Sequence, residues 1–147
     1  MTHLPTEFRE FLKLLNEHEV RYLLIGGYAV GYYGYPRATA DIDVWIACEP
    51  ENAERMVAAL TAFGFGVEEL EPALFLDENR IIRMGYAPLR IEIMMSISGV
   101  EFEACYGARR DVVLDGIEVS VIGLACLKQN KRTSGRYRDL DDLEHLP

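Results

Sequence analysis

The chain has 147 residues, half of them hydrophobic, which predicts a single domain over residues 1–147 with a hydrophobic core. Its net charge of −9 argues against sequence-independent binding to nucleic acid, because such binding depends on Lys and Arg side chains that neutralise phosphates. No apolar run approaches the ~20 residues of a membrane span, and the first residues lack the pattern of a signal peptide. We therefore expect a cytoplasmic protein without a membrane partner.

The first part of the chain predicts a helix, a strand and a second, shorter helix. Apolar residues at helical spacing predict an amphipathic helix over residues 5–18, and a short apolar run predicts a buried strand over 20–25. Gly26 and Gly27 then turn the chain into a short helix over about 28–34. Glycines leave backbone N–H groups open beside a helix start, and such groups can hold a phosphate.

Residues 41–47 predict a strand with two different faces. Residues i and i+2 of a strand point to the same side, roughly 6–7 Å apart along the chain. Asp41 and Asp43 would therefore direct two carboxylates at one point, on the same face as Trp45. Like charges repel unless a cation lies between them, and Mg²⁺ prefers carboxylate oxygens together with substrate phosphates. A phosphate-binding turn followed by metal-binding carboxylates suggests phosphoryl or nucleotidyl transfer.

The rest of the chain predicts a mixture of helices and antiparallel strands. Asp115-Gly116 lies between two apolar runs and is a strong hairpin signal, because both turn positions need positive φ. The mixture indicates an α+β fold rather than a regular βαβ series. The further elements expected are a helix over 50–64, strands over 81–84 and 89–94, a short helix over 101–107, a hairpin over 112–121, and helices over 123–131 and 137–146.

Glu92 is the best candidate for a third metal-binding carboxylate. It alternates with Ile91 and Ile93, so it faces the opposite side of its strand. A carboxylate in the middle of an apolar strand is costly unless it is paired, coordinated or exposed. The alternative is that Glu92 pairs with Arg90 or Arg83 on a solvated face of the sheet.

Cysteines and basic residues complete the set of informative side chains. Three scattered cysteines without a C-x-x-C pair predict three free thiols in a reducing cytoplasm. Five basic residues lie within eleven positions near the end of the chain, and they are either a solvated helical surface or a cationic wall facing a polyphosphate. These residues are Lys128, Lys131, Arg132, Arg136 and Arg138.

At these residues the chain resembles the DNA polymerase beta-like nucleotidyltransferase superfamily. The signature of that family is an apolar strand, Gly-[Gly/Ser], a short helix, and Asp-x-[Asp/Glu] on the next strand. Here the signature reads Ile25-Gly26-Gly27 and Asp41-Ile42-Asp43. The resemblance is strongest to small bacterial stand-alone members, which include minimal nucleotidyltransferases and abortive-infection toxin-type enzymes.

Further matches extend the resemblance along the chain. Such members often carry Arg-x-[Ser/Thr] just before the aspartates, matched here by Arg37 and Thr39. Their third carboxylate is usually Asp on a later apolar strand, so Glu92 at that place is a departure. A Lys after a hairpin is followed by Arg-x-[Lys/Arg]-Asp-x-x-Asp-Leu, and the matching residues are Lys128, Arg136, Arg138, Asp139, Asp142 and Leu143.

The resemblance implies a nucleotidyltransferase fold, with a small mixed β-sheet flanked by helices and the site at one edge of the sheet. It implies transfer of a nucleoside monophosphate, expected to be AMP, from a nucleoside triphosphate, expected to be ATP, to a hydroxyl acceptor, with release of pyrophosphate. Asp41 and Asp43 would bind two Mg²⁺ ions. Glu92 would complete the metal site or accept the proton of the acceptor hydroxyl.

The nucleotide would be bound by Gly26, Gly27, Arg37 and Lys128. The glycine amides would hold the β and γ phosphates, while Arg37 and Lys128 would oppose the charge of the polyphosphate. Thr39, the remaining residue of this set, is expected to bond mainly to the backbone of its own loop.

Two alternatives stay open at this point. Some small family members are one half of a toxin–antitoxin type module, so this chain could be a partner-binding subunit with little or no catalysis. A phosphohydrolase with the same Asp-x-Asp metals is disfavoured, because the sequence lacks His-rich ligand sets. The acceptor cannot be read from the sequence, and a homodimer mate or a partner protein could complete its pocket.

Overall fold

A mixed sheet forms the centre of the computed structural model, which describes residues 3–36, 39–65, 68–85 and 88–147 and contains six strands within those ranges. The strand order across the sheet is β3-β4-β2-β1-β6-β5. The pairs β1/β6 and β2/β4 are parallel, whereas β1/β2, β3/β4 and β5/β6 are antiparallel. The strands are β1 (Tyr22–Ile25), β2 (Asp41–Ile46), β3 (Ile81–Met84), β4 (Arg90–Met94), β5 (Arg110–Leu114) and β6 (Ile117–Val121).

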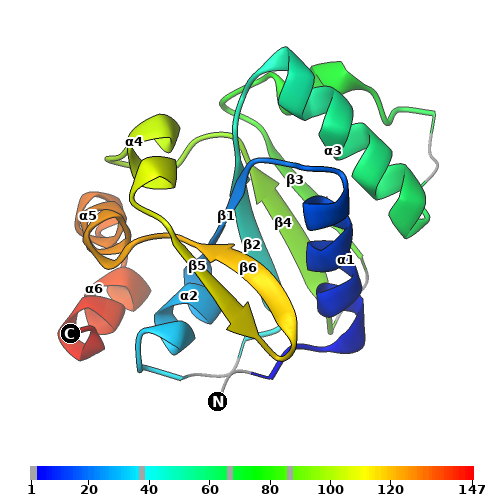
Figure 1. The fold of residues 1–147 in the computed structure, drawn as a ribbon. Coiled ribbons are helices and arrows are strands. Elements are labelled where there is room, and N and C mark those ends of the chain that lie inside the picture. The colour runs from blue at the N-terminus through cyan, green and yellow to red at the C-terminus, as the bar shows by residue number, and fades with distance from the viewer. Residues whose placement is uncertain (1–2, 37–38, 66–67, 86–87) are drawn as a thin grey trace.

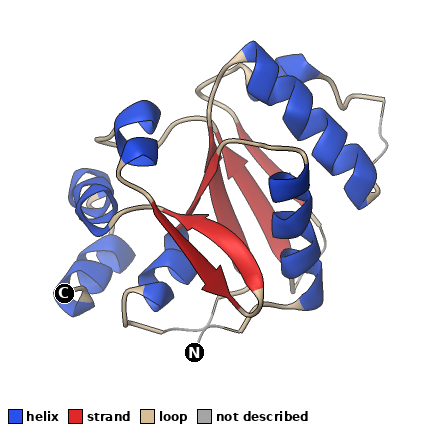
Figure 2. Ribbon diagram, in the orientation of Figure 1, coloured by secondary structure: helices blue, strands red, loops and turns tan. Residues whose placement is uncertain are grey.

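Helices cover both faces of this sheet (Figures 1 and 2). In Figure 1, α1 and α3 lie together on one side, whereas α4, α5 and α6 lie on the other. This arrangement confirms the α+β fold class expected from the sequence. The helices are α1 (Thr6–Glu17), α2 (Gly26–Tyr32), α3 (Pro50–Phe63), the 3-10 turn η1 (Pro72–Phe75), α4 (Phe102–Gly107), α5 (Leu124–Ser134) and α6 (Tyr137–His145).

Two helix boundaries differ from the sequence-based prediction. Helix α2 begins at Gly26 itself, so the glycine pair forms its first turn instead of preceding it. Helix α5 extends to Ser134 and stops at Gly135, whose φ of 65° is left-handed. A left-handed glycine commonly follows the last helical turn, and this explains why the helix ends there.

The hairpin between β5 and β6 has the geometry that its turn residues predict. Asp115 and Gly116 both have positive φ, 50° and 82°, as a two-residue hairpin turn requires. The pair Leu114 and Ile117 closes the ladder on either side of the turn.

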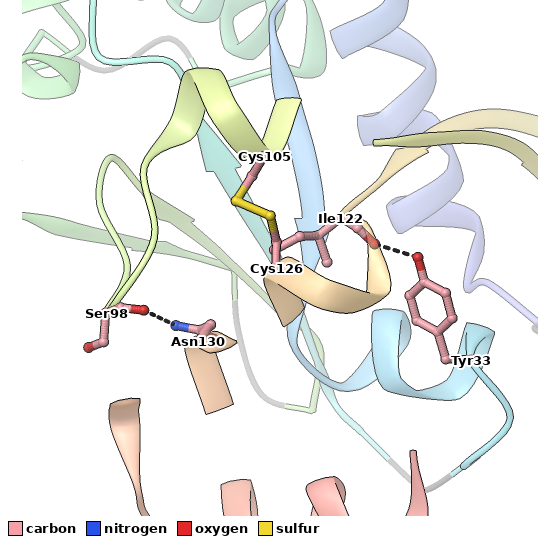
Figure 3. The surroundings of a disulfide bond; sticks show 6 residues. All are labelled: Tyr33, Ser98, Cys105, Ile122, Cys126 and Asn130. Atoms are coloured by element: carbon pink, nitrogen blue, oxygen red, sulfur yellow. Dashed lines mark hydrogen bonds between the residues drawn. A yellow bond between two sulfur atoms is a disulfide. The ribbon is translucent and has the colours of Figure 1, made fainter. Parts of the chain in front are cut away.

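Cys105 on α4 and Cys126 on α5 form a disulfide (Figure 3). The prediction of three free thiols is therefore wrong, and only Cys48 is free among the described residues. The two bonded cysteines are 21 positions apart, but the folded chain places their Cα atoms 6.0 Å apart, within the range of a disulfide. Local sequence gives no sign of this contact, because it depends on how α4 and α5 pack.

None of the helices in the described ranges combines the length and the apolar character that a membrane crossing requires.

Candidate active site

Strands β2 and β4 bring the predicted acidic residues together on one face of the sheet. The two strands are parallel neighbours, and Asp43 lies directly opposite Glu92 while Asp41 lies opposite Arg90. Since side chains alternate along each strand, Asp41, Asp43 and Glu92 share a face. The sequence pattern therefore predicted the correct side for Glu92.

Asp43 and Glu92 share a hydrogen bond between their carboxyl groups. Burial raises the pKa of Asp43 to about 7, and the hydrogen bond and charge of Glu92 and the charge of Asp41 add to this. Burial also raises the pKa of Glu92, but hydrogen bonds with Arg83 and Asp43 outweigh it, so the pKa of Glu92 is lowered overall. Asp43 is therefore the weaker acid of the two.

Arginines accompany the other two carboxylates. Arg83 Nε on β3 donates to Glu92 Oε1 at 2.9 Å, and Arg90 Nε lies 3.5 Å from Asp41 Oδ1. The alternative predicted for Glu92, a pairing with Arg83, is thus present together with the Asp43 contact. Glu92 is held between an arginine and an aspartic acid.

The start of α2 closes over Asp43. Gly26 has a φ of 69°, and a Cβ atom on it would overlap Asp43 Oδ2. A Cβ on Gly27 would approach Thr39 Cβ to 3.1 Å. Glycine is therefore required at position 26 by both its backbone angle and its contact with Asp43.

Thr39 bonds to the backbone of its own loop, as expected from the sequence. Its Oγ1 donates to the backbone oxygen of Asp41 at 3.0 Å, and lies 3.3 Å from the Asp41 N–H nitrogen. Arg37 lies outside the described residues.

These side chains line a groove of about 620 Å³. Its floor includes Gly26, Gly27, Thr39 and the carboxylates, and its walls come from β3, β4, residues 96–98, α5 and the start of α6. Cations are distributed around its rim and walls, from three different elements of the fold. They are Arg83, Lys131, Arg136 and Arg138.

Lys131 lines the groove, whereas Lys128, the lysine expected from the sequence to bind nucleotide, is not among the lining residues. Lys131 is 5% exposed, and its Nζ lies 3.1 Å from Asp139 Oδ1 and 3.0 Å from Asp142 Oδ2. Its charge lowers the pKa of Asp43 against the larger effect of burial. Lys128 does not line the groove, and its Nζ donates to the backbone oxygen of Pro147.

The spacing of residues along α5 contains a signal for the position of Lys131. Lys131 follows the buried Leu127 by four residues, so both lie on the same face of α5. A lysine on the buried face of a helix needs anionic partners, which α6 supplies.

Asp139 links this wall to the rim of the groove. It accepts a hydrogen bond from Arg136 Nε at 2.9 Å and from the Arg136 backbone N–H, which caps α6. Burial raises the pKa of Asp139, but hydrogen bonds with Arg136, Ser134 and Lys131 lower it to about 2. The hydrogen bond to Asp139 raises the pKa of Arg136 most, and the charges of Asp139, Asp43 and Glu92 raise it further against the opposing effect of burial.

The carboxylates fit a hard cation only in part. Asp41 Oδ1 and Asp43 Oδ1 are buried and accept no hydrogen bond in the described part of the protein, although Arg90 Nε forms an ion pair with Asp41 Oδ1 at 3.5 Å. Oxygens without a hydrogen bond are suitable ligands for a hard cation. No three His, Cys, Asp or Glu side chains within the described ranges are arranged as a finished metal site. Glu92 Oε1 already accepts a hydrogen bond from Arg83 Nε.

The comparison with solved structures identifies the fold. The chain is similar to a crystal structure at 1.87 Å resolution of a candidate nucleotidyltransferase from Thermotoga maritima. The TM-score is 0.61 at 16% sequence identity, and the match covers 93% of this chain and 88% of the other. No protein-family model and no curated protein sequence matches. The chain therefore has a fold of the nucleotidyltransferase type.

Proposed function

We propose that the protein is a Mg²⁺-dependent nucleotidyltransferase that transfers a nucleoside monophosphate from a nucleoside triphosphate, with AMP from ATP as the expected case. The observation that supports this most is the pair of buried oxygens on Asp41 and Asp43 that accept no hydrogen bond in the described part of the protein and lie in a groove lined by several cations. Two acidic ligands beside several cations match the needs of a metal–triphosphate complex.

In the proposed reaction the acceptor hydroxyl attacks the α-phosphorus, and the bond from that phosphorus to the bridging oxygen of the β-phosphate breaks. Pyrophosphate leaves, and the hydroxyl proton passes to a base in the groove. Bound Mg²⁺ would neutralise charge on the phosphates and lower the pKa of the hydroxyl. The chain contributes the metal-binding oxygens of Asp41 and Asp43.

Glu92 is the proposed base or third metal ligand. Its hydrogen bond with Asp43 provides a route for the proton that Asp43 must lose before it binds a cation. Arg83 keeps the Glu92 carboxylate oriented at the groove.

Lys131, Arg136 and Arg138 are proposed to oppose the charge of the triphosphate. Lys131 has three N–H donors, and Asp139 Oδ1 and Asp142 Oδ2 lie 3.1 and 3.0 Å from its Nζ. Arg37 remains a proposed nucleotide-binding residue. We also propose that the protein is cytoplasmic.

A second candidate function is that of a partner-binding subunit. The observation that favours it is on α6, where Tyr137 is 95% exposed and Leu140, three residues later, is 47% exposed. Residues three apart on a helix lie on the same side, so these two form a small apolar surface beside the groove.

Calorimetry with a non-hydrolysable ATP analogue separates the two functions. The nucleotidyltransferase predicts binding that requires Mg²⁺, whereas absence of binding with the metal present would favour the partner-binding subunit. Incubation with each labelled nucleoside triphosphate and Mg²⁺, with and without cell lysate, then tests transfer. Label on a protein, a small RNA or a small molecule would give the class of the acceptor.

A further inference from the structure

Two chain segments meet along one wall of the groove. The first is the connection from β4 to α4, which contributes residues 96–98, and the second is the C-terminal half of α5. Asn130 Nδ2 on α5 donates to the backbone oxygen of Ser98 at 3.0 Å (Figure 3). A Cβ atom on Gly99, whose φ is 80°, would overlap the Thr133 hydroxyl, so backbone and helix are in direct contact there.

The Cys105–Cys126 disulfide joins α5 to α4, the helix that follows this connection and contributes no residue to the groove lining. Cys105 lies seven positions after Ser98, and Cys126 lies on α5 one turn before Asn130. Figure 3 shows the covalent bond and the Ser98–Asn130 hydrogen bond as separate links between α5 and this part of the chain. The disulfide is the covalent one, so it limits how far the α5 wall can move.

Further contacts hold α5 near its two ends, in addition to the buried Leu127 and the hydrogen bond from Lys128 to the Pro147 backbone oxygen. Tyr33 donates to the backbone oxygen of Ile122 at 2.7 Å, just before the helix starts. Near its other end, Lys131 is held by Asp139 and Asp142 of α6. A chain without the disulfide would therefore keep α5 as a helix but lose the covalent restraint in its first half.

We propose that the Cys105–Cys126 disulfide is a redox-sensitive cross-link that fixes the α5 wall of the groove, and that its reduction loosens this wall and weakens nucleotide binding. This inference rests on the cytoplasmic location proposed above, because disulfides in reducing compartments are mostly transient or redox-sensing. The weakened nucleotide binding rests on the function proposed above, whereas the loosening of the wall does not.

Exposure determines which sulfur a reductant reaches. Cys105 is 1% exposed, whereas Cys126 is only partly buried. The thiolate of a small dithiol attacks Cys126 Sγ, the disulfide bond breaks, and Cys105 leaves as a thiolate that takes up a proton. The second thiol of the reductant then attacks the mixed disulfide and releases Cys126. The dithiol is oxidised by two electrons, and the protein is reduced by two.

The first test is on the wild-type chain, purified without reductant and then treated with a dithiol. Alkylation followed by mass spectrometry should find Cys48 as the single free thiol before reduction and all three cysteines free afterwards. Three free thiols in protein purified and stored in air would overturn the proposal.

Hydrogen exchange of the two wild-type forms then measures the wall itself. Amides in residues 96–100 and 124–134 should exchange about fivefold or more faster after reduction, while those of α1 and β6 stay unchanged. The variant Cys126→Ser should match the reduced form with or without dithiol. The variant Cys48→Ser is the matched control, because it keeps the cross-link and should respond as wild type does. Equal exchange in the oxidised and reduced wild-type forms would contradict the proposal.

Calorimetry with Mg²⁺ and the ATP analogue completes the experiment. The reduced form should bind about tenfold more weakly than the oxidised form. If neither form binds the analogue, the proposed function is wrong, while the exchange data still decide whether the cross-link fixes the wall. If both forms bind equally well, the link between the cross-link and nucleotide binding is refuted.

Discussion

The two faces of strand β2 have opposite characters. On one side, Ile42, Val44 and Ile46 are fully buried in the core. On the other side, Asp41 and Asp43 lie a few ångströms from further charges, with one oxygen each left without a hydrogen bond. One face thus contributes stability, whereas the other keeps unfavourable groups close together. Such local conflict is typical of a functional site, because the missing partner is the ligand.

Asp41→Asn, on the acidic face, should produce the largest effect. It removes a carboxylate that we propose binds Mg²⁺, so we expect Mg²⁺-dependent nucleotide transfer to fall by about a thousandfold or more. The free energy of unfolding should change by less than about 1 kcal/mol, because the pair with Arg90 is partly exposed. Labelled transfer and urea unfolding measure the two quantities. Glu118→Gln, an exposed acid on β6, is the control. Wild-type transfer by Asp41→Asn would refute the mechanism.

Ile42→Ala tests the opposite face at the neighbouring position. Removing a fully buried side chain should lower the free energy of unfolding by about 2–5 kcal/mol. Affinity for Mg²⁺ and nucleotide should stay within about twofold in the folded protein. Ile81→Ala, at a site that is 47% exposed, should lower the free energy of unfolding far less. A large loss of affinity in Ile42→Ala would show that the two faces are not independent.

Reduction of the disulfide should have the next largest effect. A cross-link over 21 positions constrains the unfolded chain, and its loss should lower the free energy of unfolding by about 3 kcal/mol. Urea unfolding with and without a dithiol measures this on wild type, and Cys48→Ser should show the same difference. An unchanged urea midpoint after reduction would mean that the cross-link does not contribute to the stability of the protein.

The pH dependence of metal binding follows from Asp43. Its pKa is raised to about 7 in the fold, so the proton must leave before the carboxylate binds Mg²⁺. We expect affinity for Mg²⁺ to increase about tenfold between pH 6 and pH 8 and then level off. The stability of the metal-free protein, in contrast to its affinity for Mg²⁺, should decrease as the pH rises. The folded state holds this proton more tightly than the unfolded chain, so stability decreases as pH rises from about 4 to about 7.

Asp43→Asn supplies the control for that pH profile. It cannot lose the proton, so the slope of affinity against pH should flatten and the loss of stability between pH 4 and pH 7 should diminish. Calorimetry at several pH values and urea unfolding give both readouts. If the affinity of this variant for Mg²⁺ changes with pH as it does in wild type, the titrating group is not Asp43.

Arg138→Met should have the smallest effect. Arg138 is exposed at the groove rim, so the loss of its charge should weaken binding of the ATP analogue by about three- to fivefold. Arg132→Met, also exposed and only six positions earlier but outside the groove lining, should leave the affinity within experimental error. Equal losses in both variants would indicate a general effect of net charge rather than a directed contact.

The sequence predicted most elements because hydrophobic periodicity is local. The alternation along β2 placed Asp41 and Asp43 on one face, and Asp115-Gly116 located the hairpin. Contacts between distant elements could not be predicted in the same way. The choice of Lys131 over Lys128 for the groove depends on the packing of α5 against α6. The Arg83–Glu92 pair was foreseen only as one of several options, because its geometry depends on the register of β3 and β4.

The disulfide was missed for the same reason. Its two cysteines belong to helices whose mutual placement has no local signal, and reasoning from the cellular compartment favoured free thiols. The start of α2 at Gly26 was also missed, because a glycine pair usually marks a turn and here contacts Asp43 within a helix.

The contact between Gly26 and Asp43 has an evolutionary consequence. Any side chain at position 26 would push the Asp43 carboxylate out of place, so its effect would resemble a change at position 43. A shorter residue at position 43 could make room, but it would remove the acid itself. The two positions therefore admit no compensatory pair, and a random mutant library selected for activity should return glycine at position 26 in every survivor.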